Sequence, residues 1–234
     1  DLAASSGEDL ASSADIAAST LRGFQLEASE AGHVADVLAK NAADTNAAIA
    51  DTGLAMKYIA PVAQSVGWSL EEVTTATGVM ADAGIKGEQA GTTLRGALTR
   101  LMKPTKDMYE SMDDLGISFY DAQGKMKPLS TIVDELQKST KGLTDEQRDN
   151  HLATIFGTEA LSGMKVLLGS SKEELDRMTD GLKNADGAAE KMADTMLDNT
   201  KGSIEEMNGS LETPGITIQK QLAPWITKGA EKVT

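Results

Sequence analysis

The chain has 234 residues, of which 40% are apolar, enough for one large globular domain or two small ones and too many for a disordered chain. It contains no cysteine, so disulfides, thiolate metal sites and cysteine nucleophiles are excluded together. A net charge of −14 argues against tight binding to nucleic acid or to an anionic membrane. No apolar run approaches the ~20 residues that a membrane span needs.

The first half of the chain has a helical period almost throughout. Residues 7–42 predict two helices rich in alanine and serine, with a break near residues 23–26. From Ile49 to Val66 the apolar and small positions step by three and four, which predicts an amphipathic helix with a kink at Pro61. The sequence therefore indicates a mainly α fold, a compact multi-helix domain of short amphipathic helices.

Helix starts and ends are marked by capping residues. The tetrapeptides that begin at Ser69, Thr144 and Ser171 each place a hydroxyl three positions before Glu or Gln, which predicts an N-cap and, in the first case, a helix over residues 69–83. Glycine is expected to end helices in the left-handed conformation at five positions, Gly67, Gly84, Gly116, Gly157 and Gly169.

The glycine-rich stretch from Gly84 to Thr92 resembles a phosphate-binding loop at first sight. Such a loop follows a strand and ends in a lysine directly before Ser or Thr, whereas here Gly91 precedes Thr92 and a helix comes before the stretch. We expect instead a corner between two helices, the second of which begins near Gly87. Gly87 and Gly91 would then permit a close neighbour, and Arg95 and Arg100 would point outward. The predicted buried stripe of this second helix is Ala90, Leu94, Ala97, Leu98 and Leu101.

One segment departs from the helical pattern. Residues 117–120 alternate, residues 121–124 suit a turn, and Pro128 follows soon after. These features predict a small β-hairpin near residues 117–127, with Ile117, Phe119 and Met126 packed on helices.

A long C-terminal helix is expected from residue 188 to residue 211. Met192, Met196 and Met207 share one face of it, either as a promiscuous binding groove or, in the favoured interpretation, as ordinary core. We divide the chain into a helical core module with an inserted hairpin (1–185) and a long helix (186–234) that leads into the rest of a longer parent protein. Because the chain starts at Asp1 without a leader, we expect it to be an excised piece.

No pattern of catalytic or metal-binding residues emerges. His33 and His151 each lack a second histidine at ligand spacing. Adjacent carboxylates diverge by ~100° on a helix, so capping is the favoured role for the pairs. These pairs are Glu71–Glu72, Asp113–Asp114, Glu173–Glu174 and Glu205–Glu206. We therefore predict no catalytic residue, no cofactor and no metal.

Several ordered blocks resemble the phage tail tape measure proteins of long-tailed phages and prophages. They are AMKYIAPVAQSVGWSLEEVTTATGVMADAGIKGEQAGTTLRGALTRLMKP, ISFYDAQGKMKPLSTIVDELQ, IFGTEALSGMKVLL and ITIQKQLAPW. The resemblance extends over roughly residues 21–224. It implies a non-enzymatic structural module that acts in tail assembly, tail-length determination and genome ejection. The implied location is the virion tail and, during assembly, the cytoplasm of the bacterial host.

The implied partners are other copies of the chain, tail tube and tail tip proteins, and assembly chaperones. Neither tight nucleic-acid binding nor a membrane span is expected. The alternative is a tail-associated peptidoglycan hydrolase module, which would need a carboxyl group with a raised pKa in a cleft. Its least implausible candidates are Glu27, Glu30 and Glu159. A third option, a DNA-binding helical regulator, is disfavoured by the charge.

Overall fold

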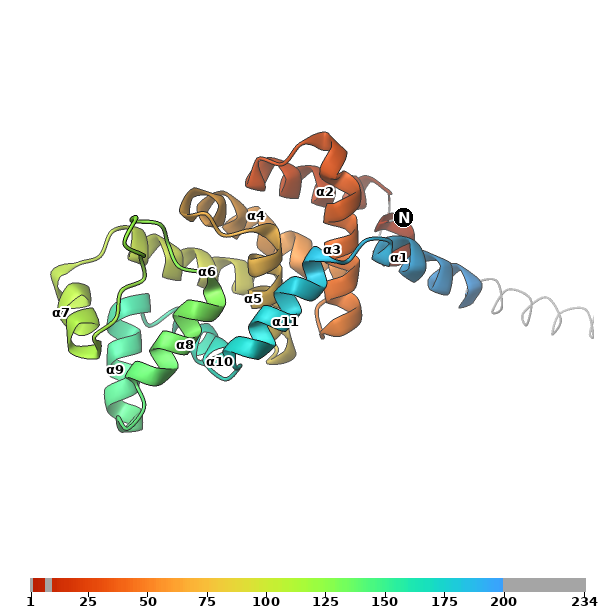
Figure 1. Cartoon of the computed structure of the whole chain (residues 1–234). Coiled ribbons are helices and arrows are strands. Elements are labelled where there is room, and N and C mark those ends of the chain that lie inside the picture. Colours follow the sequence, from red (N-terminus) through yellow and green to blue (C-terminus); the bar gives the residue numbers. More distant parts are fainter. Residues whose placement is uncertain (1, 7–9, 200–234) are drawn as a thin grey trace, which may run out of the picture.

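The computed structural model describes residues 2–6 and 10–199, and in this part of the chain it is mainly α, as predicted (Figure 1). Residues 188–199 are also helical. The other helices are α1 (Leu2–Ser6), α2 (Leu10–Phe24), the 3-10 helix η1 (Ala28–Glu30), α3 (Ala31–Asp44), α4 (Ile49–Val66), α5 (Leu70–Asp82), α6 (Gly87–Met102), α7 (Lys106–Leu115), α8 (Leu129–Ser139), α9 (Asp145–Phe156), α10 (Leu161–Leu167) and α11 (Lys172–Lys183). None of the described helices is long and apolar enough to cross a membrane.

The helices share one core. One cluster of buried apolar side chains extends from Leu2 in α1 to Ala189 in the 188–199 helix. Helices α2 and α3 lie at the end where the 188–199 helix leaves the body, and α7 and α9 lie at the other end (Figure 1). The division of the chain at residue 185 stays a prediction.

Helix α4 packs closely against α2 on one side and α6 on the other. A Cβ atom at Gly91 of α6 would lie 2.5 Å from the carbonyl oxygen of Ala55, and one at Gly53 would lie 2.5 Å from the Ile16 side chain. Real Cβ atoms do not approach other atoms so closely, so these two crossings require glycine. Small residues therefore set the spacing of these three helices, because with few aromatic side chains the core must be closed by short interhelical distances.

Helix α5 occupies the interior and is made largely of poor helix formers. Its ten residues Leu70, Val73, Thr74, Thr75, Ala76, Thr77, Gly78, Val79, Met80 and Ala81 are buried. Valine, threonine and glycine each favour the helix less than alanine does, by about 0.5–1 kcal/mol. Contacts with α3, α4, α10 and α11, such as the 2.9 Å hydrogen bond between the hydroxyls of Thr75 and Thr179, must stabilise this helix.

Most of the predicted helix starts are confirmed. The side chains of Ser69, Thr144 and Ser171 each accept a hydrogen bond from the amide three residues later. Helix α4 continues through Pro61, and the predicted break between the first two helices falls after Phe24.

The predicted helix ends are confirmed only in part. Gly67, Gly84 and Gly116 have positive φ, as expected of left-handed caps. Gly157 has φ 89° but ψ 153°, so its backbone is extended in ψ and is not a left-handed cap. Gly169 does not have positive φ, because α10 already ends at Leu167 with its cap residue in the right-handed region.

The predicted β-hairpin near residues 117–127 is wrong. Among the described residues there is no strand, and this segment has only one isolated antiparallel bridge, between Tyr120 and Met126. The groups that would continue the ladder have other partners. The Lys127 carbonyl, which lies opposite the Phe119 amide, accepts from Nε1 of Trp68 at 3.0 Å, and the Leu129 amide, which would pair with Ile117, donates to the Glu72 carboxylate at 3.2 Å. The segment is a turn whose Phe119 and Met126 side chains are buried in the core, as expected of them.

The predicted C-terminal helix is helical as far as residue 199. Its remaining part, including Met207 and the pair Glu205–Glu206, lies outside the described residues.

Candidate functional site

The glycine-rich corner is a site of helix packing. Gly84 has φ 85°, and the Ile85 amide donates to the Met80 carbonyl at 2.9 Å, which ends α5. Helix α6 then begins at Gly87, and the backbone of Ala55 occupies the space beside Gly91. The glycine at position 91 therefore makes room for α4 and not for a ligand.

The predicted buried stripe of α6 is confirmed, but only one of its two arginines points outward. Arg95 is exposed, with its guanidinium carbon 5.6 Å from the centre of the Tyr58 ring. Arg100 turns toward α9, where its Nε and Nη2 donate to the carbonyls of Ile155 and Thr154 at 3.1 and 2.7 Å. The expectation for Arg100 was wrong because its partners lie 54 and 55 positions away, beyond any local pattern.

The two histidines have different surroundings. Nε2 of His33 lies 2.8 Å from a carboxylate oxygen of Glu71, whereas Nδ1 of His151 lies 2.8 Å from the hydroxyl of Ser111. In the part of the chain that the structure describes, no group of three His, Asp or Glu side chains could hold a metal ion.

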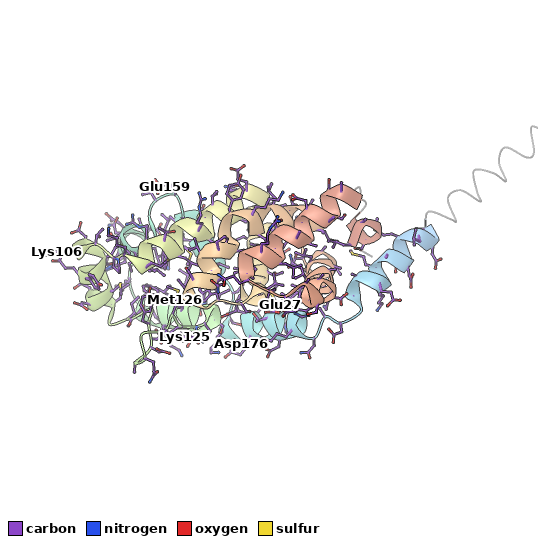
Figure 2. All side chains as sticks on the ribbon, turned by 90° about the horizontal axis from the view of Figure 1, so that it is seen from above. Glu27, Lys106, Lys125, Met126, Glu159 and Asp176 are labelled. Carbon is purple, nitrogen blue, oxygen red and sulfur yellow. The ribbon has the colours of Figure 1, made fainter. Side chains whose placement is uncertain are left out.

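The three candidate hydrolase carboxylates do not converge on one cleft. The side chain of Glu30 accepts from the amide of Glu27 at 2.8 Å, so these two residues form the cap of η1. Glu159 lies between α9 and α10, away from Glu27, beside a depression of about 450 Å³ that Thr92, Gly96 and Arg100 also line (Figure 2). This arrangement offers no facing pair of carboxyl groups for glycoside hydrolysis.

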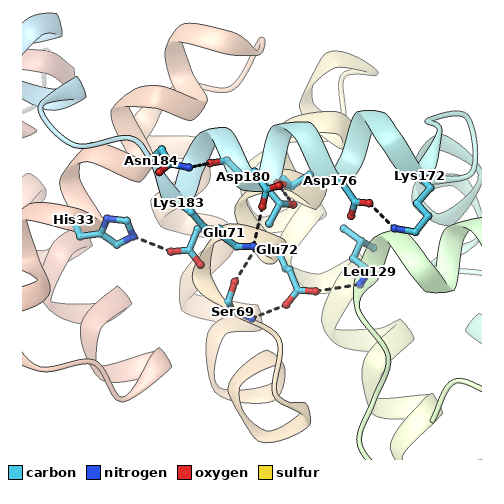
Figure 3. A network of polar contacts seen from close by, with 12 residues as sticks. His33, Ser69, Glu71, Glu72, Leu129, Lys172, Asp176, Asp180, Lys183 and Asn184 are labelled. Atoms are coloured by element: carbon cyan, nitrogen blue, oxygen red, sulfur yellow. Dashed lines mark hydrogen bonds and ion pairs between the residues drawn. The ribbon is translucent and has the colours of Figure 1, made fainter. Parts of the chain in front are cut away.

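The pair Glu71–Glu72 is the centre of a polar network at the start of α5 (Figure 3). Burial raises the pKa of Glu71, but hydrogen bonds with Ser69 and His33 lower it more, so the pKa lies below the usual range of a glutamate. The neighbouring carboxylate of Glu72 accepts from the Ser69 amide at 3.0 Å and from the Leu129 amide at 3.2 Å. The two carboxylates have different partners: Glu72 caps helix starts, as expected of such pairs, and Glu71 connects α5 to His33 of α3.

Of the other two described carboxylate pairs, one lies at the start of a helix and one lies near the end of a helix. Glu173 and Glu174 lie in the first turn of α11, where negative charge is favourable. Asp113 and Asp114 lie instead near the C-terminal end of α7, so a capping role does not apply to them.

Sequence patterns did not reveal the side chains that cap helices distant in the chain. The carboxylate of Asp36 accepts from the amides of Gly187 and Ala189, and Nε2 of Gln137 donates to the carbonyls of Leu168 and Ser170 after α10. One signal was present in the sequence: the helices that begin after Pro128 and Gly187 have no local capping side chain. Such a start requires a cap from elsewhere, but the sequence does not say from where.

Comparison with known proteins assigns the family. The family model described as phage-related minor tail protein matches residues 1–157. The chain is 55% identical over 234 residues to the tape measure protein of Pneumococcus phage Dp-1, covering all of this chain and 20% of that protein. It is 34% identical over 201 residues to the probable tape measure protein of Escherichia phage P2, covering 85% of this chain and 25% of that protein. No solved structure matches the chain.

The chain thus spans about a fifth to a quarter of the length of the curated relatives it matches. The matches agree with the resemblance seen in the ordered sequence blocks, and the described helices agree with the expected fold class. The chain belongs to the phage tail tape measure family, which the matching model describes as phage-related minor tail proteins.

Proposed function

We propose that this chain is a non-catalytic structural module of a tape measure protein, and that the parent protein acts in tail assembly, tail-length determination and genome delivery. The observation that carries the proposal is the 55% identity to a tape measure protein along the whole chain. The geometry supports a structural role, because Gly53 and Gly91 allow close helix packing and the Glu72 carboxylate caps two helix starts.

The proposed partners are other copies of the chain, tail tube and tail tip proteins, and assembly chaperones. The proposed locations are the phage tail and, during assembly, the host cytoplasm. The net charge of −14 supports the view that the module does not bind DNA that passes it, because like charges repel.

An in-frame duplication in the phage that encodes the module tests this proposal. If residues 1–234 count toward tail length, the duplication should lengthen tails by up to roughly 350 Å, the length of a continuous helix at ~1.5 Å per residue. A matched control replaces the module with an unrelated helical segment of equal length. Tail lengths are measured by electron microscopy. If they stay unchanged on duplication, this module does not determine tail length.

A direct assay tests the non-catalytic part of the proposal. The chain is incubated with purified peptidoglycan, and soluble fragments are separated by chromatography. We expect no release above buffer. Release that Glu159→Gln abolishes would establish the hydrolase instead.

A further inference from the structure

The 188–199 helix follows α11 in the chain, but its first residues contact α3. We call residues 184–187, with their contacts to α3, the joint. After α11 ends at Lys183, residues 184–187 form a short turn in which Gly187 has φ 78°. One carboxylate oxygen of Asp36 accepts from the Gly187 amide at 3.1 Å, and the other accepts from the Ala189 amide at 2.9 Å. Asp36 therefore caps a helix whose N-cap residue, Gly187, lies 151 positions later in the chain, and its negative charge stabilises that end of the helix.

A second contact connects the turn to α3 one helical turn before Asp36. Nδ1 of His33 lies 3.9 Å from a carboxylate oxygen of Asp186, while its Nε2 lies 2.8 Å from Glu71 of α5. The contact to Glu71 holds the ring toward α5, as Figure 3 shows. The turn is thus bounded on one side by two α3 side chains.

Small side chains close the same joint by packing. Ala185, Ala189 and Ala193 repeat every four residues and are at most 5% exposed. Residues four apart share one face of a helix, so Ala189 and Ala193 face the body, while Ala185 packs from the turn before the helix. Further along the helix, Met196 and Leu197 are exposed. Packing of alanine side chains does little to fix the direction of the helix axis. The two hydrogen bonds of Asp36 fix it more strictly, because hydrogen bonds depend on angle.

We propose that Asp36 locks the joint, so that the 188–199 helix continues the domain rigidly in one direction, and that without its carboxylate residues 184–187 become a hinge. The inference deepens the proposed function, since a rigid joint would pass the orientation of this module to the following part of a tape measure protein. Its test needs no phage, so it can fail while the proposed function stands.

The test is a distance measurement between two spin labels on the 234-residue chain. Because the chain has no cysteine, the substitutions Gln89→Cys on α6 and Asp194→Cys on the 188–199 helix provide the sole labelling sites, and both positions are exposed. We expect a narrow distance distribution for the labelled chain. Asp36→Ala should broaden it roughly twofold, because a helix that loses its N-cap frays from that end.

Two further variants decide between a lock and a general loss of structure. Asp36→Asn keeps one acceptor oxygen and should broaden the distribution less than Asp36→Ala. Glu146→Ala removes an exposed carboxylate from the first turn of α9, at the other end of the domain, and should leave the distribution unchanged. A broad distribution in the parent chain, or no broadening in Asp36→Ala with the circular dichroism spectrum intact, overturns the proposal.

Discussion

The carboxylate of Glu72 accepts a hydrogen bond from the amide of Leu129 at 3.2 Å and thereby connects the start of α5 to the start of α8. The same carboxylate accepts from the Ser69 amide at 3.0 Å, so one side chain caps two helices. Pro128, which precedes α8, has no side chain that could do this.

Removing the shared cap should destabilise both helices. We expect Glu72→Ala to lower the free energy of unfolding by about 1–3 kcal/mol, and Glu72→Gln, which keeps one acceptor, by less. Thermal unfolding should show a fall of ~2–4 °C per kcal/mol. The matched control is Glu146→Ala, an exposed first-turn carboxylate of α9 whose loss should cost less than half as much. Equal losses in the two alanine variants would show that only the helix dipole matters.

Two glycines of α6 should respond in opposite directions to alanine. At Gly91 the new methyl group would lie 2.5 Å from a backbone oxygen of α4, and we expect a loss of at least ~2 kcal/mol. At Gly96 no atom lies within 4 Å of that position, so Gly96→Ala should stabilise the domain by about 0.5–1 kcal/mol. Urea unfolding of both variants measures the difference. Destabilisation by Gly96→Ala would show that α6 needs glycine there for another reason.

Acidic pH should weaken the contact between α3 and α5. The pKa of Glu71 is lowered in the folded state by Ser69 and His33, against the opposing effect of burial. Its contribution to stability is therefore fully present above its unfolded value of about 4.3, and it is lost as the pH falls through the lower, folded value.

The comparison variant for this prediction is Glu71→Gln. Between pH 7 and pH ~3.5 its urea midpoint should fall less than that of the parent chain, because one titrating carboxylate has been removed. A parallel fall in both proteins would mean that Glu71 titrates equally in the folded and unfolded states.

Arg100 should stabilise the end of α9. Its Nε and Nη2 donate to two carbonyls from one planar group, which a lysine cannot reproduce. We expect Arg100→Lys to cost about 1–2 kcal/mol and to speed amide hydrogen exchange in α9. Arg95→Lys is the control, because Arg95 is exposed and contacts the Tyr58 ring and not α9. Unchanged exchange in α9 of the Arg100 variant would contradict this role.

The acidic chain should not bind DNA at physiological salt. With a net charge of −14, its repulsion from phosphates should keep fluorescence anisotropy of a labelled duplex unchanged up to about 100 μM protein. Binding that weakens steeply with added salt would reveal a basic face that the net charge conceals.

The sequence predicted those features that depend on neighbouring residues. The caps at Ser69, Thr144 and Ser171, the left-handed Gly67, Gly84 and Gly116, and the start of α6 follow from rules that act within a few positions. The close approach at Gly91 was also predictable, because glycine in a helix interior is costly unless a neighbour needs the space.

The prediction failed where a local pattern competes with distant groups. The segment from Ile117 to Lys127 alternates like a hairpin, but the ladder ends after a single bridge because Trp68 and Glu72 bind the Lys127 carbonyl and the Leu129 amide that would continue it. Arg100 has the periodicity of an exposed position, yet the carbonyls of α9 bind it.

By itself, the sequence determined the family, the helical class and most helix starts, because hydrophobic period and capping act over three or four residues. Only the tertiary structure decided which helix each distant cap serves, as in the pairs Glu72 with Leu129 and Asp36 with Gly187. The physical reason is that the free amides or carbonyls of a helix end can bond to any suitable side chain that folding brings near. Such a side chain has no fixed spacing from the helix in the sequence, so no local pattern predicts it.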